Sequence, residues 1–400
     1  METELCLSLD AENRSEYENF EDEEEIKLFL NETKRRNKCS EIEKFLETDF
    51  TEDPDYLNKL RSFSLSEGGL VNDKIRKQVW PKLLGIRPEN LEPYPSEIEF
   101  ESHVEFSQVV LDVNRSIKRF PPGIPYNQRL AMQDQLIRLI LRVIMKHPQL
   151  QYYQGYHDVA ITFLLVVGEN MAFHIMEKLS TVHLKHFMEA TMEKTAELLD
   201  YIFPLMEHVH PELCSYIEKG EVGSMFCLPW FLTWYSHTLN KYENVVRLYD
   251  YFLASEPLIP LYLVPVIVIY RQDAIFAVEC EMSSLHQELS QLPDNLPFDR
   301  LLKEARDLYN KYPPQDIEKE AIMRRVKLKA LQEEQINRKN YSNKTTNRSP
   351  SRRNWTFMQR IVPDWFFPYG RLGLLIFSAS FIVGLYAYYR YANNCDGFNQ

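Results

Sequence analysis

The sequence predicts an all-α protein with one large helical domain and a single membrane-spanning helix near its C-terminus. Three observations lead to this prediction. Glycine makes up only 12 of 400 residues, against a typical share of about 7%, and this scarcity favours helices. Apolar residues recur at the spacing of amphipathic helices, and we find no convincing set of alternating strands. Residues 372–389 form a run of eighteen residues without a charge.

The N-terminal segment is strongly acidic. Residues 1–25 contain eleven acidic residues and one base, Arg14, and they have too few apolar groups to pack. We therefore expect residues 1–50 to be a largely disordered tail. The whole chain carries a net charge of −12, which opposes nonspecific binding to nucleic acid.

The central residues, 55–315, are predicted to form one helical domain. Its clearest helix has Leu136, Ile140 and Ile144 on one face and ends before Pro148. Further helical runs, each bounded by Pro, Gly, Asn or Asp, are residues 159–167, 193–203, 230–239, 243–253 and 298–309. Residues 258–270 are apolar but contain two prolines and are too short to span a bilayer, so we expect a buried, kinked core element.

Two polar segments follow this domain. Residues 316–337 are predicted to be a charged helical extension. Residues 338–364 are a basic linker, rich in Ser, Thr and Asn in its first part. A linker of this kind gives the domain reach from its anchor.

The apolar run begins at Leu372 and ends at Tyr389. As a helix it would be roughly 27 Å long, close to the hydrocarbon thickness of the ER membrane. Aromatic residues flank both ends, as at membrane interfaces. More arginines precede the run than follow it, so the domain should face the cytosol and residues 390–400 the lumen. The alternative is a buried core helix, but such a helix would seldom come last, behind a polar basic linker.

Several kinds of chemistry find no support in the sequence. Neither G-x-x-x-x-G-K nor G-x-G-x-x-G occurs, so the chain lacks the common glycine loops that bind phosphate. The six cysteines are scattered, and no histidine pair has the spacing of a zinc motif. We expect no cofactor and no metal site in this chain.

Two polar clusters in apolar surroundings remain. In the first, Asp112 and Arg115 are spaced i and i+3 and would meet on one face of a helix. By itself this pair is equally compatible with an ordinary intrahelical ion pair, worth a few tenths of a kcal/mol. The second cluster, residues 152–158, reads Tyr-Tyr-Gln-Gly-Tyr-His-Asp and is equally compatible with a packed aromatic turn.

These clusters resemble two motifs of the TBC domain of Rab GTPase-activating proteins. Val109-x-x-Asp112-x-x-Arg115 is similar to the family's I-x-x-D-x-x-R, and Tyr152-x-Gln154-Gly155 matches Y-x-Q-G. Other matches occur in the expected order, at residues 68–70, 75–85, 210–213 and 228–232, so that the resemblance covers roughly residues 60–310. The departures are conservative: Val109 replaces Ile, and Cys227 replaces Ser.

The resemblance implies a role for five residues. Arg115 is the expected arginine finger, which stabilises negative charge on the transferred phosphate. Gln154 is the expected second finger, which orients the attacking water. Gly155 would let its loop approach the partner closely, and Tyr152 would buttress that loop. Asp112 is expected to hold Arg115 rather than act as a general base, because a carboxylate beside the γ-phosphate would be repelled.

Three other residues have weaker assignments. Arg119 lies one helical turn beyond Arg115 and is an alternative phosphate-side or acidic-surface contact, although the motif spacing selects Arg115. Arg76 and Trp80 match family positions near the start of the domain and are expected to be structural.

The resemblance thus implies an all-helical Rab-GAP domain that acts in trans on a GTP-bound Rab GTPase, which itself brings the nucleotide and Mg²⁺. With the membrane span, it implies an ER-membrane protein of the ER-to-Golgi step with a cytosolic domain. One alternative is a catalytically silent Rab-binding scaffold or tether. Another is a membrane-shaping protein whose helical domain is only structural, which would leave both motifs without a purpose.

Overall fold

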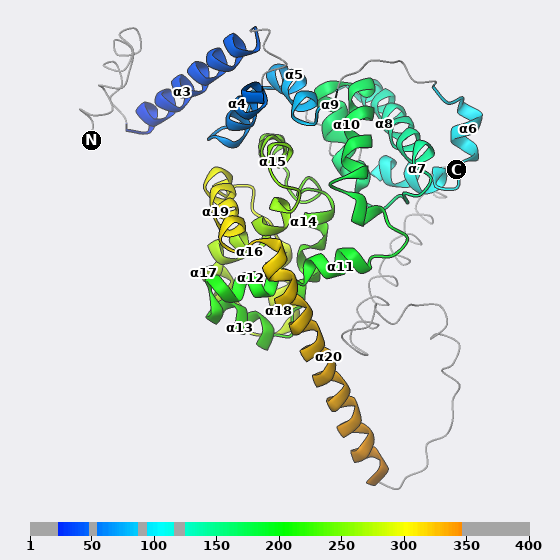
Figure 1. Cartoon of the computed structure of the whole chain (residues 1–400), viewed down its shortest axis with the longest axis vertical. Coiled ribbons are helices and arrows are strands. Elements are labelled where there is room, and N and C mark those ends of the chain that lie inside the picture. The colour runs from blue at the N-terminus through cyan, green and yellow to red at the C-terminus, as the bar shows by residue number, and fades with distance from the viewer. Residues whose placement is uncertain (1–22, 48–53, 87–93, 116–124, 346–400) are drawn as a thin grey trace, which may run out of the picture. The chain divides into compact units, whose positions relative to one another are not determined.

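The computed structural model describes residues 23–47, 54–86, 94–115 and 125–345. In these residues every regular element is a helix and no strand occurs, which confirms the predicted all-α class (Figure 1). The chain divides into two units, residues 1–330 and 331–400. The first unit contains the hydrophobic core and all the site residues described below.

The helices in chain order are α3 (Glu23–Leu46), α4 (Pro54–Leu65), α5 (Asp73–Leu83), α6 (Glu97–Ser102), α7 (Phe106–Arg115), α8 (Tyr126–Lys146), α9 (Tyr156–Val167), α10 (Glu169–Thr181), η2 (Lys185–Met188), α11 (Glu193–Leu199), α12 (Ile202–Val209), α13 (Pro211–Lys219), η3 (Ser224–Cys227), α14 (Leu228–Leu232), α15 (Tyr242–Ala254), α16 (Ile259–Tyr270), α17 (Gln272–Ala277), α18 (Met282–Ser290), α19 (Phe298–Lys311) and α20 (Pro314–Thr345).

Helix α3 corrects the expectation of a largely disordered tail over residues 1–50. It places Ile42 in the core and stacks Phe45 on Tyr56 of α4. Two ion pairs join it to the following helices: Glu41 with Lys59 at 3.1 Å and Glu43 with Lys74 at 2.9 Å. The acidic excess is confined to residues 1–25 and does not extend to these packing residues, which have partners only in the folded domain. Residues 1–22 lie outside the described residues.

Helices α7 to α10 form the part of the domain that carries the two sequence motifs. The predicted helix before Pro148 is confirmed as α8, which packs against α7, α9 and α10. Helix α9 is buried along nearly its whole length and also contacts α5. Helix α7, which carries the first motif, and helix α9, which follows the second, are therefore both packed against α8.

Two helix predictions were wrong. The helix expected over residues 193–203 divides into α11 and α12. Pro204 has no N–H to donate to the carbonyl of Asp200, and this missing bond favours a break in the helix at residues 200 and 201. The helix expected over residues 230–239 ends at Leu232 with α14, and Trp234 and Tyr235 have positive φ angles of 48° and 68°.

The apolar segment at residues 258–270 is confirmed as a buried element. It forms α16, which contains Pro265 and packs against α12 and α19. The predicted runs at residues 159–167, 243–253 and 298–309 are confirmed as α9, α15 and α19.

Helix α20 contains the expected extension, residues 316–337, and continues eight residues into the range expected to be linker. Near its start Arg325 pairs with Asp200 at 2.6 Å and with Glu197 at 3.3 Å, which ties this turn to α11 and its C-cap. Residues 346–364, the predicted membrane span at 372–389 and the tail at 390–400 lie outside the described residues. Within the described ranges, no helix combines the length and the apolar character needed to cross a bilayer.

Candidate functional site

Arg115 is the last residue of α7, where a cation is favourable at the negative end of the helix dipole. Val109 and Val113 fasten the helix to the core by its apolar face. The side chain of Arg115 remains 68% exposed. Its Nη1 lies 3.8 Å from Oδ1 of Asp112, so the i, i+3 pair expected from the sequence does form.

Asp112 is almost completely buried, with 1% exposure. Its Oδ1 accepts a hydrogen bond from Nε2 of Gln108 at 3.1 Å, and its Oδ2 accepts one from the hydroxyl of Tyr152 at 3.0 Å. A buried carboxylate is costly without such donors. Asp112 is therefore a fixed anchor for Arg115 and is not exposed to a partner.

Tyr152 belongs to the turn that precedes α9. Burial, followed by the charge of Asp112, raises the pKa of its hydroxyl. The hydroxyl is therefore a neutral donor at physiological pH, and the bond to Asp112 persists. This one bond joins the end of α7 to the turn that carries the second motif.

Gln154 is exposed at the tip of this turn. Hydrogen bonds to the core fix two neighbouring tyrosines. The hydroxyl of Tyr153 donates to the carbonyl of Leu232 at 2.8 Å, and the hydroxyl of Tyr156 lies 2.7 Å from that of Ser180. Tyr153 also packs edge-on against Tyr156. The aromatic residues thus form a rigid base, and the carboxamide is presented to solvent.

Gly155 follows with φ of +108°, a backbone conformation that L-residues rarely adopt. A Cβ at this position would lie 2.8 Å from Cγ2 of Thr233. Gly155 therefore also has a role within the chain, while its close approach to a partner stays a prediction. Glycine lets the turn pack against the segment that follows α14.

Three further polar residues extend this network, and the sequence analysis gave none of them a role. Nδ1 of His157 lies 3.0 Å from the Tyr152 hydroxyl. Nε2 of His157 lies 3.5 Å from Oδ2 of the buried Asp158. The same oxygen lies 2.7 Å from Nδ1 of His237, a half-exposed residue. His157 and Asp158 belong to the second polar cluster, residues 152–158, whereas His237 reaches this cluster only in the folded domain.

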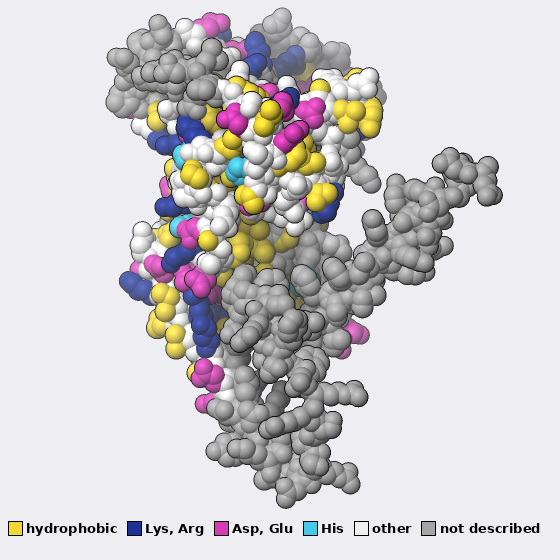
Figure 2. All heavy atoms as spheres, turned by 90° about the vertical axis from the view of Figure 1, so that its right-hand side faces the viewer, with side chains coloured by type: hydrophobic (Ala, Val, Ile, Leu, Met, Phe, Trp, Pro, Cys, Tyr) yellow, Lys and Arg dark blue, Asp and Glu magenta, His cyan; other side chains and the backbone are white. Residues whose placement is uncertain are grey.

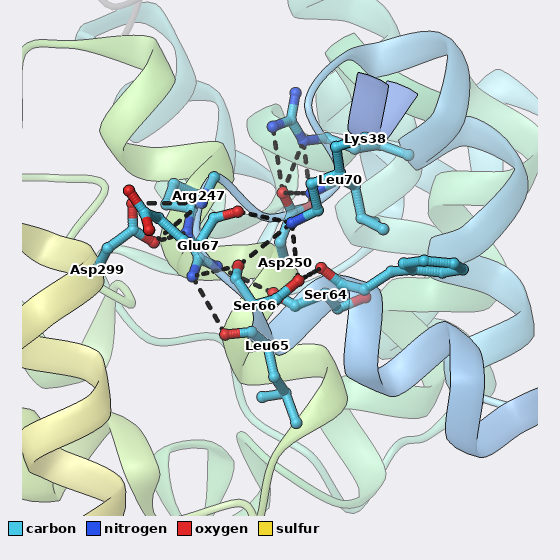
Figure 3. A network of polar contacts seen from close by, with 12 residues as sticks. Lys38, Ser64, Leu65, Ser66, Glu67, Leu70, Arg247, Asp250 and Asp299 are labelled. Atoms are coloured by element: carbon cyan, nitrogen blue, oxygen red, sulfur yellow. Dashed lines mark hydrogen bonds and ion pairs between the residues drawn. The ribbon is translucent and has the colours of Figure 1, made fainter. Parts of the chain in front are cut away.

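Arg76 and Trp80 belong to a separate network around Asp250, a fully buried residue of α15 (Figure 3). Oδ1 of Asp250 accepts from Nε of Arg76 at 3.1 Å and from the indole of Trp80 at 2.8 Å. Its Oδ2 accepts from the backbone N–H of Leu70 at 2.9 Å. These contacts support the structural role expected of Arg76 and Trp80. Asp250 was not predicted from the sequence, although it is an isolated acid among buried apolar residues.

The same region holds a polar groove of about 780 Å³ between α3, α5 and α15. Two of its arginines are already paired with acids: Arg76 with Asp73 at 2.7 Å and Arg247 with Asp299 at 2.6 Å. Lys38 donates to the backbone carbonyls of Ser66 and Glu67, and burial together with the nearby Arg247 lowers its pKa to about 8 (Figure 3). None of the residues that line this groove belongs to the Arg115 and Gln154 network.

The surface around the two motifs mixes apolar and charged groups. Figure 2 shows hydrophobic, acidic and basic side chains interspersed on the right-hand face of Figure 1, where α6 and α7 lie. Leu111, one turn before Arg115, is half exposed, and Ile98 and Val104 are more exposed still. Arg119 lies outside the described residues. Within the described ranges, no group of three or more His, Cys, Asp or Glu side chains is placed to hold a metal ion.

Comparison with known proteins decides the family. The Rab-GTPase-TBC domain matches residues 73–276, just over half of the chain. This chain belongs to the RabGAP-TBC family. The resemblance predicted from the motifs is thereby confirmed, and membership assigns the chain to the TBC-domain Rab GTPase-activating proteins.

Similar full-length proteins extend this result beyond the matched domain. The chain is 45% identical over 288 residues to TBC1 domain family member 20 of Homo sapiens. The aligned region covers 72% of this chain and 70% of that protein. It is 46% identical over 288 residues to the Mus musculus protein of the same name, with 72% and 71% covered. The solved Ypt/Rab-GAP domain of Gyp1p has the same fold, with a TM-score of 0.57, 16% identity, and 70% of this chain and 99% of that chain covered.

Proposed function

We propose that this protein accelerates GTP hydrolysis by a GTP-bound Rab-family GTPase at the ER membrane, supplying Arg115 and Gln154 in trans. One observation carries the proposal. An exposed arginine and an exposed glutamine are linked through a buried and a half-buried residue, because Arg115 pairs with the buried Asp112 and Asp112 accepts from Tyr152, two residues before Gln154. Two solvent-facing groups on a shared rigid base suit insertion into another protein's nucleotide site.

The chemistry of Arg115 supports this role. Its guanidinium is planar and always charged, and it can donate two parallel hydrogen bonds to phosphate oxygens. The pair with Asp112 restricts the side chain before a partner arrives, which lowers the entropy lost when the finger engages. The contact of 3.8 Å is longer than a strong charge-assisted hydrogen bond, so the guanidinium can move onto the phosphate.

The chemistry of Gln154 supports a complementary role. A carboxamide both donates and accepts hydrogen bonds, so it can hold an attacking water between itself and the γ-phosphate. The buried aromatic base fixes the backbone of the turn, and only the side chain needs to adjust. In this proposal GTP and Mg²⁺ come with the GTPase, and the chain itself needs no cofactor.

The location is a separate part of the proposal. It rests on the charge-free run at residues 372–389, on its length and on the excess of arginine on its N-terminal side. A single span near the end of the chain would leave the helical domain in the cytosol, where Rab GTPases are accessible, and residues 390–400 in the lumen.

The second candidate function is a Rab-binding scaffold or tether without catalysis. It keeps the fold and the docking of the GTPase but gives no purpose to two linked, exposed groups of this chemistry. The two candidates differ in one measurement, the rate of phosphate release from the bound GTPase.

The test uses the purified full-length protein in detergent and a panel of GTP-loaded Rab GTPases. We expect accelerated phosphate release with at least one of them, and a loss on the order of 10³-fold in Arg115→Lys, since arginine fingers are worth at least that much in rate. Gln154→Ala should also lose most of the acceleration. Arg61→Lys, an exposed arginine of α4 outside this network, is the matched control. Equal rates for wild type and Arg115→Lys would refute the finger assignment, and binding without acceleration would favour the scaffold.

A further inference from the structure

The hydroxyl of Tyr152 contacts two groups that compete for one proton. Its oxygen lies 3.0 Å from Oδ2 of Asp112 and 3.0 Å from Nδ1 of His157. A tyrosine hydroxyl has a single hydrogen to donate. The hydroxyl donates this hydrogen to Oδ2 of Asp112. The contact with His157 can then be a hydrogen bond only if Nδ1 carries a proton and donates to the phenol oxygen.

The far side of the imidazole is held as well. Nε2 of His157 lies 3.5 Å from Oδ2 of Asp158, and this carboxylate is only 1% exposed. The ring is itself buried, with 6% of its surface exposed. A neutral imidazole has a single N–H, so the contacts with Tyr152 and Asp158 are favourable together only when each ring nitrogen carries a proton. In that form the neighbours on both edges fix the orientation of the ring, and Nδ1 stays directed at Tyr152.

Resting on the proposed function, we infer that His157 is a positioning residue for both fingers. Its Nδ1–H donates a hydrogen bond to the Tyr152 oxygen. The hydroxyl hydrogen of Tyr152 is then directed to Asp112. Asp112 in turn holds Arg115, while Tyr152 carries the turn of Gln154. An unprotonated nitrogen in the same place would draw the proton away and leave Oδ2 of the buried Asp112 without this donor, at a substantial desolvation cost.

The inference makes a distinction between two amide substitutions. In His157→Asn the amide nitrogen can take the place of Nδ1, so a donor toward Tyr152 is retained. In His157→Gln the amide reaches the position of Nε2 instead and leaves Tyr152 without its donor. His157→Leu has about the volume of the ring's inner part and no polar atom. A purely space-filling role would rank these variants by shape rather than by donor position.

The test measures kcat and KM for Rab GTP hydrolysis with the full-length protein. We expect His157→Asn to stay close to wild type, and His157→Gln and His157→Leu to lose kcat on the order of 10²-fold with little change in KM, since small misplacements of catalytic groups cost that much. His208→Leu removes an imidazole that bonds to Glu320 outside this network and should be neutral for the rate. Thermal unfolding of all variants identifies any loss of folding.

Two further arms keep the inference falsifiable. If His157 acts through Tyr152, the double variant Tyr152→Phe with His157→Leu should be no slower than Tyr152→Phe alone. Independently of any GTPase, ¹⁵N-histidine labelling should show one slowly exchanging imidazole N–H whose resonance shifts in Tyr152→Phe. Equal activity of wild type and His157→Leu, equal rescue by Gln and Asn, or the absence of that N–H signal would overturn the inference. If wild type activates no Rab, the proposed function fails, and the labelling arm still decides whether the hydrogen bond exists.

Discussion

The hydroxyl of Tyr152 donates a 3.0 Å hydrogen bond to Oδ2 of Asp112, across forty residues of sequence. Asp112 belongs to α7 and Tyr152 to the turn before α9, so the bond joins the two motifs that the sequence keeps apart. The exposed groups of the site, Arg115 and Gln154, are each held by one end of this bond.

Removing that hydroxyl should weaken both stability and activity. Tyr152→Phe leaves Oδ2 of Asp112 buried without its donor, which we expect to lower the free energy of unfolding by about 1–3 kcal/mol. GTPase activation should fall more than the small loss of folded protein explains. Tyr126→Phe, which removes an exposed hydroxyl, is the control. Denaturant unfolding and phosphate release are the measurements, and an unchanged rate in Tyr152→Phe would contradict the coupling.

Substituting Gly155 should distort the turn for two separable reasons. Gly155→Ala must adopt a φ of +108° and place its Cβ 2.8 Å from Cγ2 of Thr233. Thr233→Ser removes that methyl group and keeps the hydroxyl, so the double variant should recover part of the lost stability. Gly85→Ala also has a positive φ, of +66°, but meets no atom within 4 Å, and it isolates the backbone strain, which is worth about 1–2 kcal/mol. Equal losses in Gly155→Ala and Gly85→Ala would show that the Thr233 contact is unimportant.

Asp250 should be the most sensitive acid of the domain. Asp250→Ala leaves the buried guanidinium of Arg76 without this partner, along with the indole of Trp80 and the N–H of Leu70. Breaking a buried ion pair typically costs about 3–5 kcal/mol. Asp299→Ala removes a more exposed partner of Arg247 and should cost far less. Chemical denaturation measures both, and similar losses in the two variants would contradict the ranking.

His183 should make the fold sensitive to acid. Burial lowers its pKa from 6.5 to about 4, and its Nδ1 has no hydrogen-bond partner in the part of the chain that the structure describes. Between pH 6.5 and 4 the unfolded chain binds a proton that the native state refuses, so stability falls as the pH falls. The difference amounts to roughly 3 kcal/mol by pH 4. His183→Leu should flatten the unfolding free energy over this window, and an identical pH dependence in the variant would exclude His183 as its source.

Deleting residues 372–389 should release the protein from membranes, because this run supplies the apolar length of the proposed anchor. Fractionation of cells that express the full chain and the deletion variant measures the effect. The isolated variant should keep its GTPase activation in solution, since the site lies within residues 112–158. Retention of the deletion variant in the membrane fraction would count against the anchor.

The sequence predicted the helical class and the two motifs because both depend on local information. Apolar spacing defines helices such as α8 and α19, and the i, i+3 spacing of Asp112 and Arg115 forms a contact within one helix. Predictions from the sequence were wrong where contacts between distant residues override the local pattern. Trp234 and Tyr235 leave the expected helix because the hydroxyl of Tyr235 reaches the carbonyl of Pro260 and both rings are buried.

By itself, the sequence predicted which residues carry the proposed chemistry: Arg115, Gln154 and Gly155 at family spacing, with Asp112 and Tyr152 as their supports. Only the tertiary structure decided how these groups connect, since it bonds Tyr152 directly to Asp112 and brings His157 and His237 into the network. Hydrogen-bond partners at 2.7–3.0 Å depend on how helices pack, and no local pattern records that. Helix α3 shows the same limit, because its buried residues find their partners on α4 only after folding.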